Sequence, residues 1–239
     1  GLSGEKVIAS IEAGRMWLNL RRVSDVDRRY RDVVDQIFEE VRAHVPGYET
    51  FSRTCGILIS SPKAQVYYHS DLPGQSLWQM HGVKRVYVYP DEAPYLYPEQ
   101  LEHIALNEVE VDMRYEPAFD KGALVFDLEP GQMLHWQLNA PHRVENHDCL
   151  NVSMTTEYWT DGIRRRQMVN LANGILRERF GIRPRSRATS GPSFWAKAAM
   201  QAGMRRAGLL ERTRKSVRPI DFRLDPAQPG RIVDLGAPA

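Results

Sequence analysis

Eight short segments between residues 54 and 159 have the pattern of β-strands, and this run constrains the fold more than any other feature. The segments are apolar or alternating and rich in β-branched and aromatic residues. Turn signals separate them, among them Ser-Pro at 61–62, Leu-Pro-Gly at 72–74 and Glu-Pro-Gly at 129–131. So many short strands in sequence predict a mostly β protein with a double-sheet jelly-roll core.

Helical patterns flank this run and interrupt it once. The apolar spacing and the capping residues predict helices at 4–13, 25–44, 98–106, 161–180 and 194–215. A further strand is expected at 16–23, and the segment 219–236 is expected to add a strand or to lie along the surface. We therefore expect three parts: a helical and strand scaffold at 1–50, the jelly-roll core at 51–160, and a helical extension at 161–239.

The composition is that of a soluble globular protein. Of 239 residues, 42% are hydrophobic and 26% are charged, which is enough to bury one core. No apolar run approaches the roughly 20 residues that span a bilayer, so no membrane partner is expected. The first residues lack the layout of a signal peptide. Cys55 and Cys149 lie in apolar strand-like stretches, and we expect both to be buried free thiols in a cytoplasmic protein.

Charge is distributed unevenly along the chain. Residues 160–219 carry 15 Lys and Arg against 3 Asp and Glu, whereas residues 1–159 carry 15 against 24. Three interpretations of the basic extension stay open: a solvated helical surface, a homodimer interface along 194–210, or a contact with nucleic acid or another polyanion. Binding to nucleic acid would fall steeply with salt.

Four residues carry the chemistry that the sequence suggests. His69 and Asp71 are two positions apart on an expected strand, so their side chains point to the same face and can share one ion. His142 can supply a second imidazole. Two histidines and one carboxylate leave coordination positions open, which suits a non-haem Fe(II) oxygenase. Lys84 lies on the strand that follows.

The segments VYYHSD, HGVKRVYVYP and NAPHRVEN resemble the JmjC-type, cupin-like Fe(II)/2-oxoglutarate-dependent oxygenases, in particular the asparaginyl hydroxylases and related bacterial cupin-like proteins. The resemblance covers roughly residues 50–160 and implies a double-stranded β-helix. It also implies that His69, Asp71 and His142 are the catalytic metal ligands. Lys84 would bind the distal carboxylate of 2-oxoglutarate.

Three positions depart from the asparaginyl hydroxylases. Val66 stands where they carry a hydroxyl residue, and Gln75 and Glu157 stand where they carry asparagine. An acid beside an anionic co-substrate repels it, unless that acid is protonated or faces away. The departures therefore bear on 2-oxoglutarate binding more than on metal binding.

Other residues could replace the hydrogen bonds that these departures remove. The candidates are Tyr67, Gln79 and Tyr87, and we place Tyr67 and Gln79 with Lys84 in the co-substrate site. His135 in LHWQL competes with His142 for the third ligand position. We prefer His142 because of its spacing from Gly131.

The leading hypothesis is an Fe(II)- and 2-oxoglutarate-dependent oxygenase that hydroxylates a protein side chain or a small molecule. One alternative is a non-catalytic metal-binding module that acts in regulation or interaction. Another is an iron enzyme of the same fold that does not use 2-oxoglutarate. No segment is a substrate-specific signature.

Overall fold

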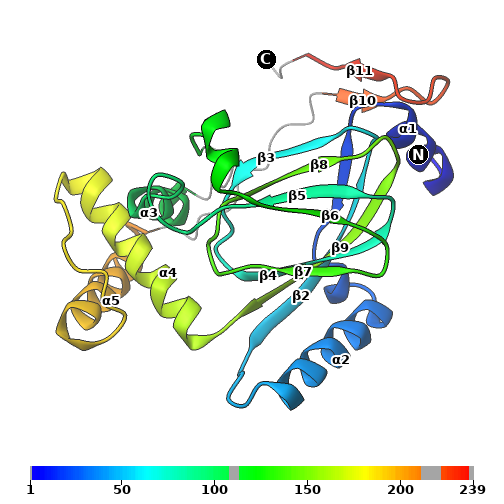
Figure 1. Ribbon diagram of the computed structural model, residues 1–239. Helices are drawn as coiled ribbons and strands as arrows, with labels where there is room; N and C mark the ends of the chain where they lie inside the picture. The colour runs from blue at the N-terminus through cyan, green and yellow to red at the C-terminus, as the bar shows by residue number, and fades with distance from the viewer. Residues whose placement is uncertain (1, 108–112, 211–221, 237–239) are drawn as a thin grey trace.

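The computed structural model describes residues 2–107, 113–210 and 222–236. Its core is a double-sheet jelly roll (Figure 1). All strand pairs within the two sheets are antiparallel. The five-stranded sheet has the order β1 (Trp17–Leu20), β2 (Phe51–Ser60), β9 (Asn151–Trp159), β4 (Gly74–His81) and β7 (Met133–His135). The four-stranded sheet has the order β3 (Gln65–His69), β8 (His142–Asn146), β5 (Lys84–Val88) and β6 (Leu124–Leu128). The prediction of a mostly β jelly roll with flanking helices is confirmed.

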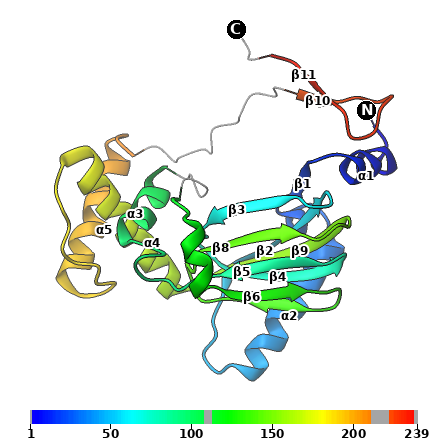
Figure 2. The same ribbon diagram turned by 45° about the horizontal axis from the view of Figure 1, so that its top comes forward.

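Helices lie outside the two sheets (Figure 2). The α-helices are α1 (Gly4–Ala13), α2 (Arg28–His44), α3 (Pro98–Asn107), α4 (Asp161–Gly174) and α5 (Gly191–Arg206). Shorter helical turns are Val23–Asp25, Pro117–Gly122 and the π-helical turn Ile175–Arg179, which prolongs α4. A hairpin of β10 (Phe222–Leu224) and β11 (Ile232–Asp234) follows. The helix expected at 194–215 begins earlier and ends at Arg206; residues 211–215 lie outside the described part.

Three apolar clusters hold these layers together. The inner faces of the two sheets meet in a core that includes Leu77, Val86 and Val144. Because side chains alternate between the faces of a strand, a second set points outward from each sheet. On the five-stranded sheet this set packs against Val34 and Phe38 of α2. The apolar face of α2, which its amphipathic sequence predicts, thus covers the outer side of the five-stranded sheet.

A buried carboxylate connects the C-terminal helices to α3. Glu102 is fully buried, and it accepts hydrogen bonds from Arg177 at 2.8 Å, Arg187 at 3.3 Å and Asn173 at 3.1 Å. A buried charge is tolerated only when it is paired and hydrogen-bonded. Part of the basic charge of the extension therefore neutralises an acid inside the molecule.

α3 and α4 make a close backbone contact at Gly174. A Cβ atom added there would lie 2.5 Å from the backbone oxygen of Glu102, whereas one added at Gly203 in α5 would meet nothing within 4 Å. We expect Gly174→Ala to lower the free energy of unfolding by about 1–3 kcal/mol, the usual cost of overpacking. Gly203→Ala should leave it unchanged or raise it by up to about 1 kcal/mol. Urea unfolding of the two variants measures both, and equal effects would contradict the close contact.

Two expectations about the whole chain can be compared with the structure. Within the described ranges, no helix is long and apolar enough to cross a membrane. Cys55 and Cys149 are both free thiols, as expected. Cys55 is buried, but Cys149 is partly exposed, because it lies in the turn between β8 and β9.

Candidate metal centre

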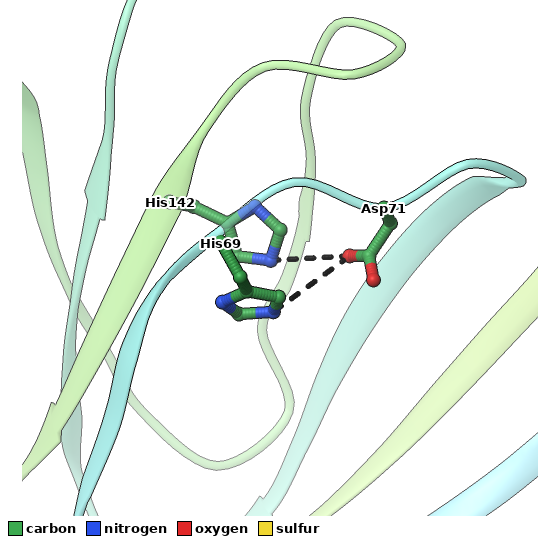
Figure 3. Close-up of side chains that lie close together, drawn as sticks. All are labelled: His69, Asp71 and His142. Carbon is green, nitrogen blue, oxygen red and sulfur yellow. Dashed lines mark ion pairs between the residues drawn. The ribbon is translucent and has the colours of Figure 1, made fainter. Parts of the chain in front are cut away.

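His69, Asp71 and His142 lie together at one end of the jelly roll (Figure 3). His69 ends β3 and His142 begins β8, and the two are paired across these neighbouring strands. Their ring centroids are 4.1 Å apart. Asp71 follows β3 in the turn toward β4. One potential ligand atom from each residue lies within 4.8 Å of the other two.

Backbone hydrogen bonds orient both imidazoles. Nδ1 of His69 donates to the carbonyl of Tyr67 at 2.7 Å, and Nδ1 of His142 donates to the carbonyl of Ala140 at 3.1 Å. This leaves Nε2 of each ring unprotonated in the neutral form and turned toward Asp71, at 4.0 Å for His69 and 3.2 Å for His142. A ring N–H held by a carbonyl is the usual way in which proteins fix the tautomer of a metal-binding histidine.

Burial keeps His69 in the protonation state that a metal needs. The side chains of His69, Asp71 and His142 are only 13%, 11% and 4% exposed. Burial, and after it the neighbouring His142, lowers the pKa of His69 to about 4. His69 is therefore a neutral imidazole at neutral pH, and a neutral imidazole is the form that binds metal.

The donor set fits a divalent first-row metal ion. Neighbouring ligands held about 2.1 Å from one ion lie roughly 3 Å apart. The two Nε2–carboxylate distances of 3.2 and 4.0 Å approach this spacing, so small side-chain movements suffice. Two imidazoles and one carboxylate on one side of an ion leave the other positions open.

Asn139 connects the two segments that carry the ligands, and the sequence analysis missed it. Its side-chain amide donates to the backbone carbonyl of Asp71 at 2.7 Å, and its backbone carbonyl accepts from the hydroxyl of Ser70 at 2.7 Å. Asn139 is 5% exposed and has a φ of 65°. Asparagine is one of the few residues that tolerate this left-handed conformation, which was a usable signal in the turn before His142.

Removing this connection should loosen the candidate site without unfolding the protein. Asn139→Gly keeps the backbone conformation but loses the bond to Asp71. We expect it to weaken metal binding about tenfold, as is common when a hydrogen bond that supports a ligand is lost. Lys63→Gly is the matched control, because Lys63 also has a positive φ, of 59°, and lies on the surface. Calorimetric metal titration compares them, and equal affinities would exclude a positioning role for Asn139.

Lys84 lies inside the same jelly roll, toward the other end. On β5 it alternates with Arg85 and faces inward with Val86 and Val88, and it is 4% exposed. It pairs with Asn146 on β8, whereas Val88 pairs with His142, so Lys84 and His142 share a face four residues apart. That separation is about 13 Å along the strand before the side chains reach toward each other.

The ammonium group of Lys84 has no acidic partner among the residues that the structure describes. Burial lowers its pKa to about 8, and the nearby Cys149 thiol opposes this shift. A buried cation without a counter-charge is costly, and an anionic ligand would relieve that cost.

The structure gives other contacts to the remaining candidates for the co-substrate site. Gln79 is 1% exposed, and its amide nitrogen donates to the carbonyls of His81 and Gly82 and to Asn151, while Ser153 donates to its oxygen. The side chain of Gln79 is thus used fully by the protein. Tyr67 is 73% exposed. The roles predicted for Gln79 and Tyr67 do not fit these positions.

Tyr87 does not fit the co-substrate site either. It lies on the outer face of the four-stranded sheet, where the guanidinium of Arg143 stacks 3.4 Å from its ring centroid. Of the positions that depart from the asparaginyl hydroxylases, Gln75 on β4 and Glu157 on β9 are direct cross-strand partners. Val66 packs into the inner core.

His135 is not part of the cluster. Its Nδ1 donates to the carbonyl of Gln75 at 2.7 Å, and the group that could hold a metal contains His142 instead. Trp136 packs against the centre with its ring centroid 4.4 Å from that of His142. The choice of His142 over His135 thus agrees with the geometry.

Comparison with known proteins adds no functional assignment. No family model matches the chain, and no curated protein matches it. Among similar solved structures are ycfD of E. coli (16% identity, TM-score 0.43, 79% of this chain and 48% of that one) and the DMSP lyase DddQ of Ruegeria pomeroyi (9%, 0.30, 45% and 39%). A third is an RmlC-like cupin of Shewanella frigidimarina (11%, 0.29, 44% and 65%). The chain thus spans less than two thirds of each of them, and the fold assignment rests on the strand order.

Proposed function

We propose that this protein is an Fe(II)- and 2-oxoglutarate-dependent oxygenase that hydroxylates a C–H bond of its substrate. The observation that carries the proposal is a combination inside one jelly roll. Two imidazoles and a carboxylate converge at one end, and a buried lysine without an acidic partner among the described residues faces the same interior. The first feature suits iron, and the second suits a dicarboxylate that reaches from the metal into the barrel.

Each residue has a defined task in this proposal. His69, Asp71 and His142 hold the metal on one side, and the backbone bonds at their Nδ1 atoms keep Nε2 available. The ammonium of Lys84 binds the distal carboxylate as a point charge. Bound there, Fe(II) and 2-oxoglutarate supply the oxidising chemistry, with succinate and CO2 as co-products. The two sheets orient the reactants.

Anaerobic titration with Fe(II) tests the proposal directly. In metal-free protein we expect a visible metal-to-ligand charge-transfer band that needs both Fe(II) and 2-oxoglutarate and that is absent in His142→Ala. Formation of succinate under air then tests turnover. Tight Fe(II) binding without the band would contradict the use of 2-oxoglutarate.

The second candidate is a metal-binding module of the cupin type without oxygenase activity. The pair formed by Gln75 and Glu157 favours it, because the asparaginyl hydroxylases that the sequence resembles carry asparagine at both positions. An acid beside the co-substrate would oppose its binding. This candidate predicts metal binding that is insensitive to 2-oxoglutarate, and any turnover of 2-oxoglutarate would exclude it. An iron enzyme that works without 2-oxoglutarate would instead keep its activity in Lys84→Ala.

A further inference from the structure

Apolar side chains face the interior of the jelly roll but stay uncovered between β6 and β7. These strands are at the edges of the four-stranded and the five-stranded sheet. Phe126 and Leu124 pair with Val86 and Val88, which are 0% and 8% exposed, so all four point into the barrel. Nevertheless Phe126 is 39% exposed and Leu124 is 65% exposed. The interior is therefore open to solvent along this gap.

The gap is a hollow large enough for a small ligand. Its volume is about 500 Å³, and Leu134 of β7 and Trp136 complete its apolar wall. Ligand sites in proteins usually occupy 300–1,000 Å³ and are mostly apolar with a few polar groups. Uncovered apolar surface of this kind marks a place where something binds.

The hollow shares a wall with the candidate metal centre. Trp136 lines the hollow and packs 4.4 Å from the ring centroid of His142. Ala140 also lines it, and its carbonyl accepts the hydrogen bond from Nδ1 of His142. Val88 is the cross-strand partner of His142. A molecule in the hollow is thus next to a metal ligand.

The polar groups of the hollow accept hydrogen bonds. Asp91 is an acceptor and is bonded by Gln137 at 3.0 Å. Because Nδ1 of His135 donates to a carbonyl, Nε2 is the acceptor in the neutral form of the ring. Among the described residues that line the hollow there is no lysine or arginine. An anion would therefore be disfavoured, and a donor group would be matched.

We infer that this hollow binds the substrate, and that the substrate has an apolar body with a hydrogen-bond donor, such as an ammonium or hydroxyl group, at one end. The inference deepens the proposed function and rests on it in one respect: the bound molecule is a substrate only if the protein is an oxygenase. The binding itself depends on the walls of the hollow and on Asp91 and His135. It can therefore be measured without metal.

Three probes of similar shape test whether the hollow prefers a hydrogen-bond donor to an anion. Phenethylamine, phenethyl alcohol and phenylacetate are titrated into metal-free full-length protein, with the fluorescence change of tryptophan as readout, since Trp136 lines the hollow. We expect the amine and the alcohol to bind at least about tenfold more tightly than the carboxylate, a difference of about 1.4 kcal/mol. Equal or tighter binding of phenylacetate overturns the inference.

A pair of neighbouring variants locates the site. Leu124→Arg puts a cation into the hollow and should reverse the preference, because the amine is repelled and the carboxylate gains a partner. Val125→Arg is the matched control, since Val125 is also on β6 and 47% exposed but pairs with Tyr87 on the outer face. It should bind the probes as the wild type does. Amine binding that survives in Leu124→Arg, with its melting temperature unchanged, overturns the location.

Two further experiments test whether a ligand in the hollow lies next to the metal and which class of substrate it represents. In protein loaded with Co(II), the amine should shift the visible spectrum of the metal; binding without a shift overturns the substrate role. If no metal binds, the proposed function is wrong. The probe titrations in metal-free protein still test whether the hollow binds a ligand. Comparing the free amine with an acetylated peptide that carries one lysine distinguishes a small-molecule substrate from a protein side chain.

Discussion

Replacing His69 with alanine is expected to abolish useful Fe(II) binding while the protein stays folded. The variant keeps only one imidazole and one carboxylate. Loss of a mere supporting hydrogen bond often costs 10–100-fold in metal affinity, so loss of a ligand should cost more than about 100-fold. Calorimetric titration under anaerobic conditions measures the affinity.

The stability of the fold gives an independent readout of the same change. A metal that binds only the native state raises its stability by about 2.7 kcal/mol at a free concentration of 100 times Kd. Fe(II) should therefore raise the melting temperature of the wild type but not of His69→Ala. His135→Ala is the control, because His135 is nearby but bonded to Gln75 and outside the cluster. Wild-type affinity in His69→Ala, or equal losses in both variants, would disprove the assignment.

Strand alternation predicted most of the architecture, and a bulge explains where it failed. The sequence analysis placed Tyr67 with Lys84 in the co-substrate site, and on a regular strand Tyr67 would share the face of His69, two positions later. In the structure the register of β3 against β8 shifts between Val66 and His69. Val66 and His69 both belong to the interior although three positions separate them, which leaves Tyr67 exposed. A bulge of this kind leaves no clear signal in one sequence.

The roles of Gln79 and Asn139 depended on long-range contacts that no local pattern encodes. Gln79 alternates correctly into the interior, but its partners Asn151 and Ser153 are more than 70 residues away along the chain. Asn139 matters because it reaches Asp71 across 68 residues. The alternation along a strand predicts which face of the sheet a side chain lies on. It does not predict which distant polar group the side chain bonds to.

The basic extension shows the same limit of sequence patterns. Its charge suggested a polyanion or a dimer partner, yet Arg177 and Arg187 are bonded to the buried Glu102 of α3. The sequence predicts the helix at 98–106 but does not distinguish Glu102 from its other acid. The solvated surface, the dimer interface and the nucleic-acid contact remain predictions for the other basic residues, as do the boundaries of the three expected parts.

Lys84→Met is expected to stabilise the metal-free protein and to remove 2-oxoglutarate binding. Methionine fills a similar volume without a charge. The pKa of Lys84 is about 8 in the folded protein against an ordinary 10.5. Each unit corresponds to about 1.4 kcal/mol, so burying the ammonium costs up to about 3 kcal/mol at neutral pH. The variant should be more stable than the wild type by up to that amount.

The pH dependence gives this prediction its sign. The folded protein releases the proton of Lys84 near pH 8, whereas the unfolded chain holds it until about pH 10.5. Stability rises with pH wherever the unfolded state binds more protons. Between pH 8 and pH 10.5 the free energy of unfolding of the wild type should therefore rise relative to that of Lys84→Met. Above pH 10.5 the variant should no longer be the more stable protein. Urea unfolding at several pH values measures the difference, and a constant difference would contradict a buried ammonium.

Binding of 2-oxoglutarate should reverse the order of stability at neutral pH. The distal carboxylate would supply the counter-charge that Lys84 lacks, and a charge-assisted bond contributes about 1.5–3 kcal/mol. With Fe(II) present, 2-oxoglutarate should stabilise the wild type and bind Lys84→Met about 100-fold more weakly. Lys63→Met is the control, because Lys63 is exposed and paired with Asp148 at 2.8 Å. A buried lysine without an acidic partner among the described residues is best explained by the anion that it binds. Undiminished 2-oxoglutarate binding in Lys84→Met would remove that explanation.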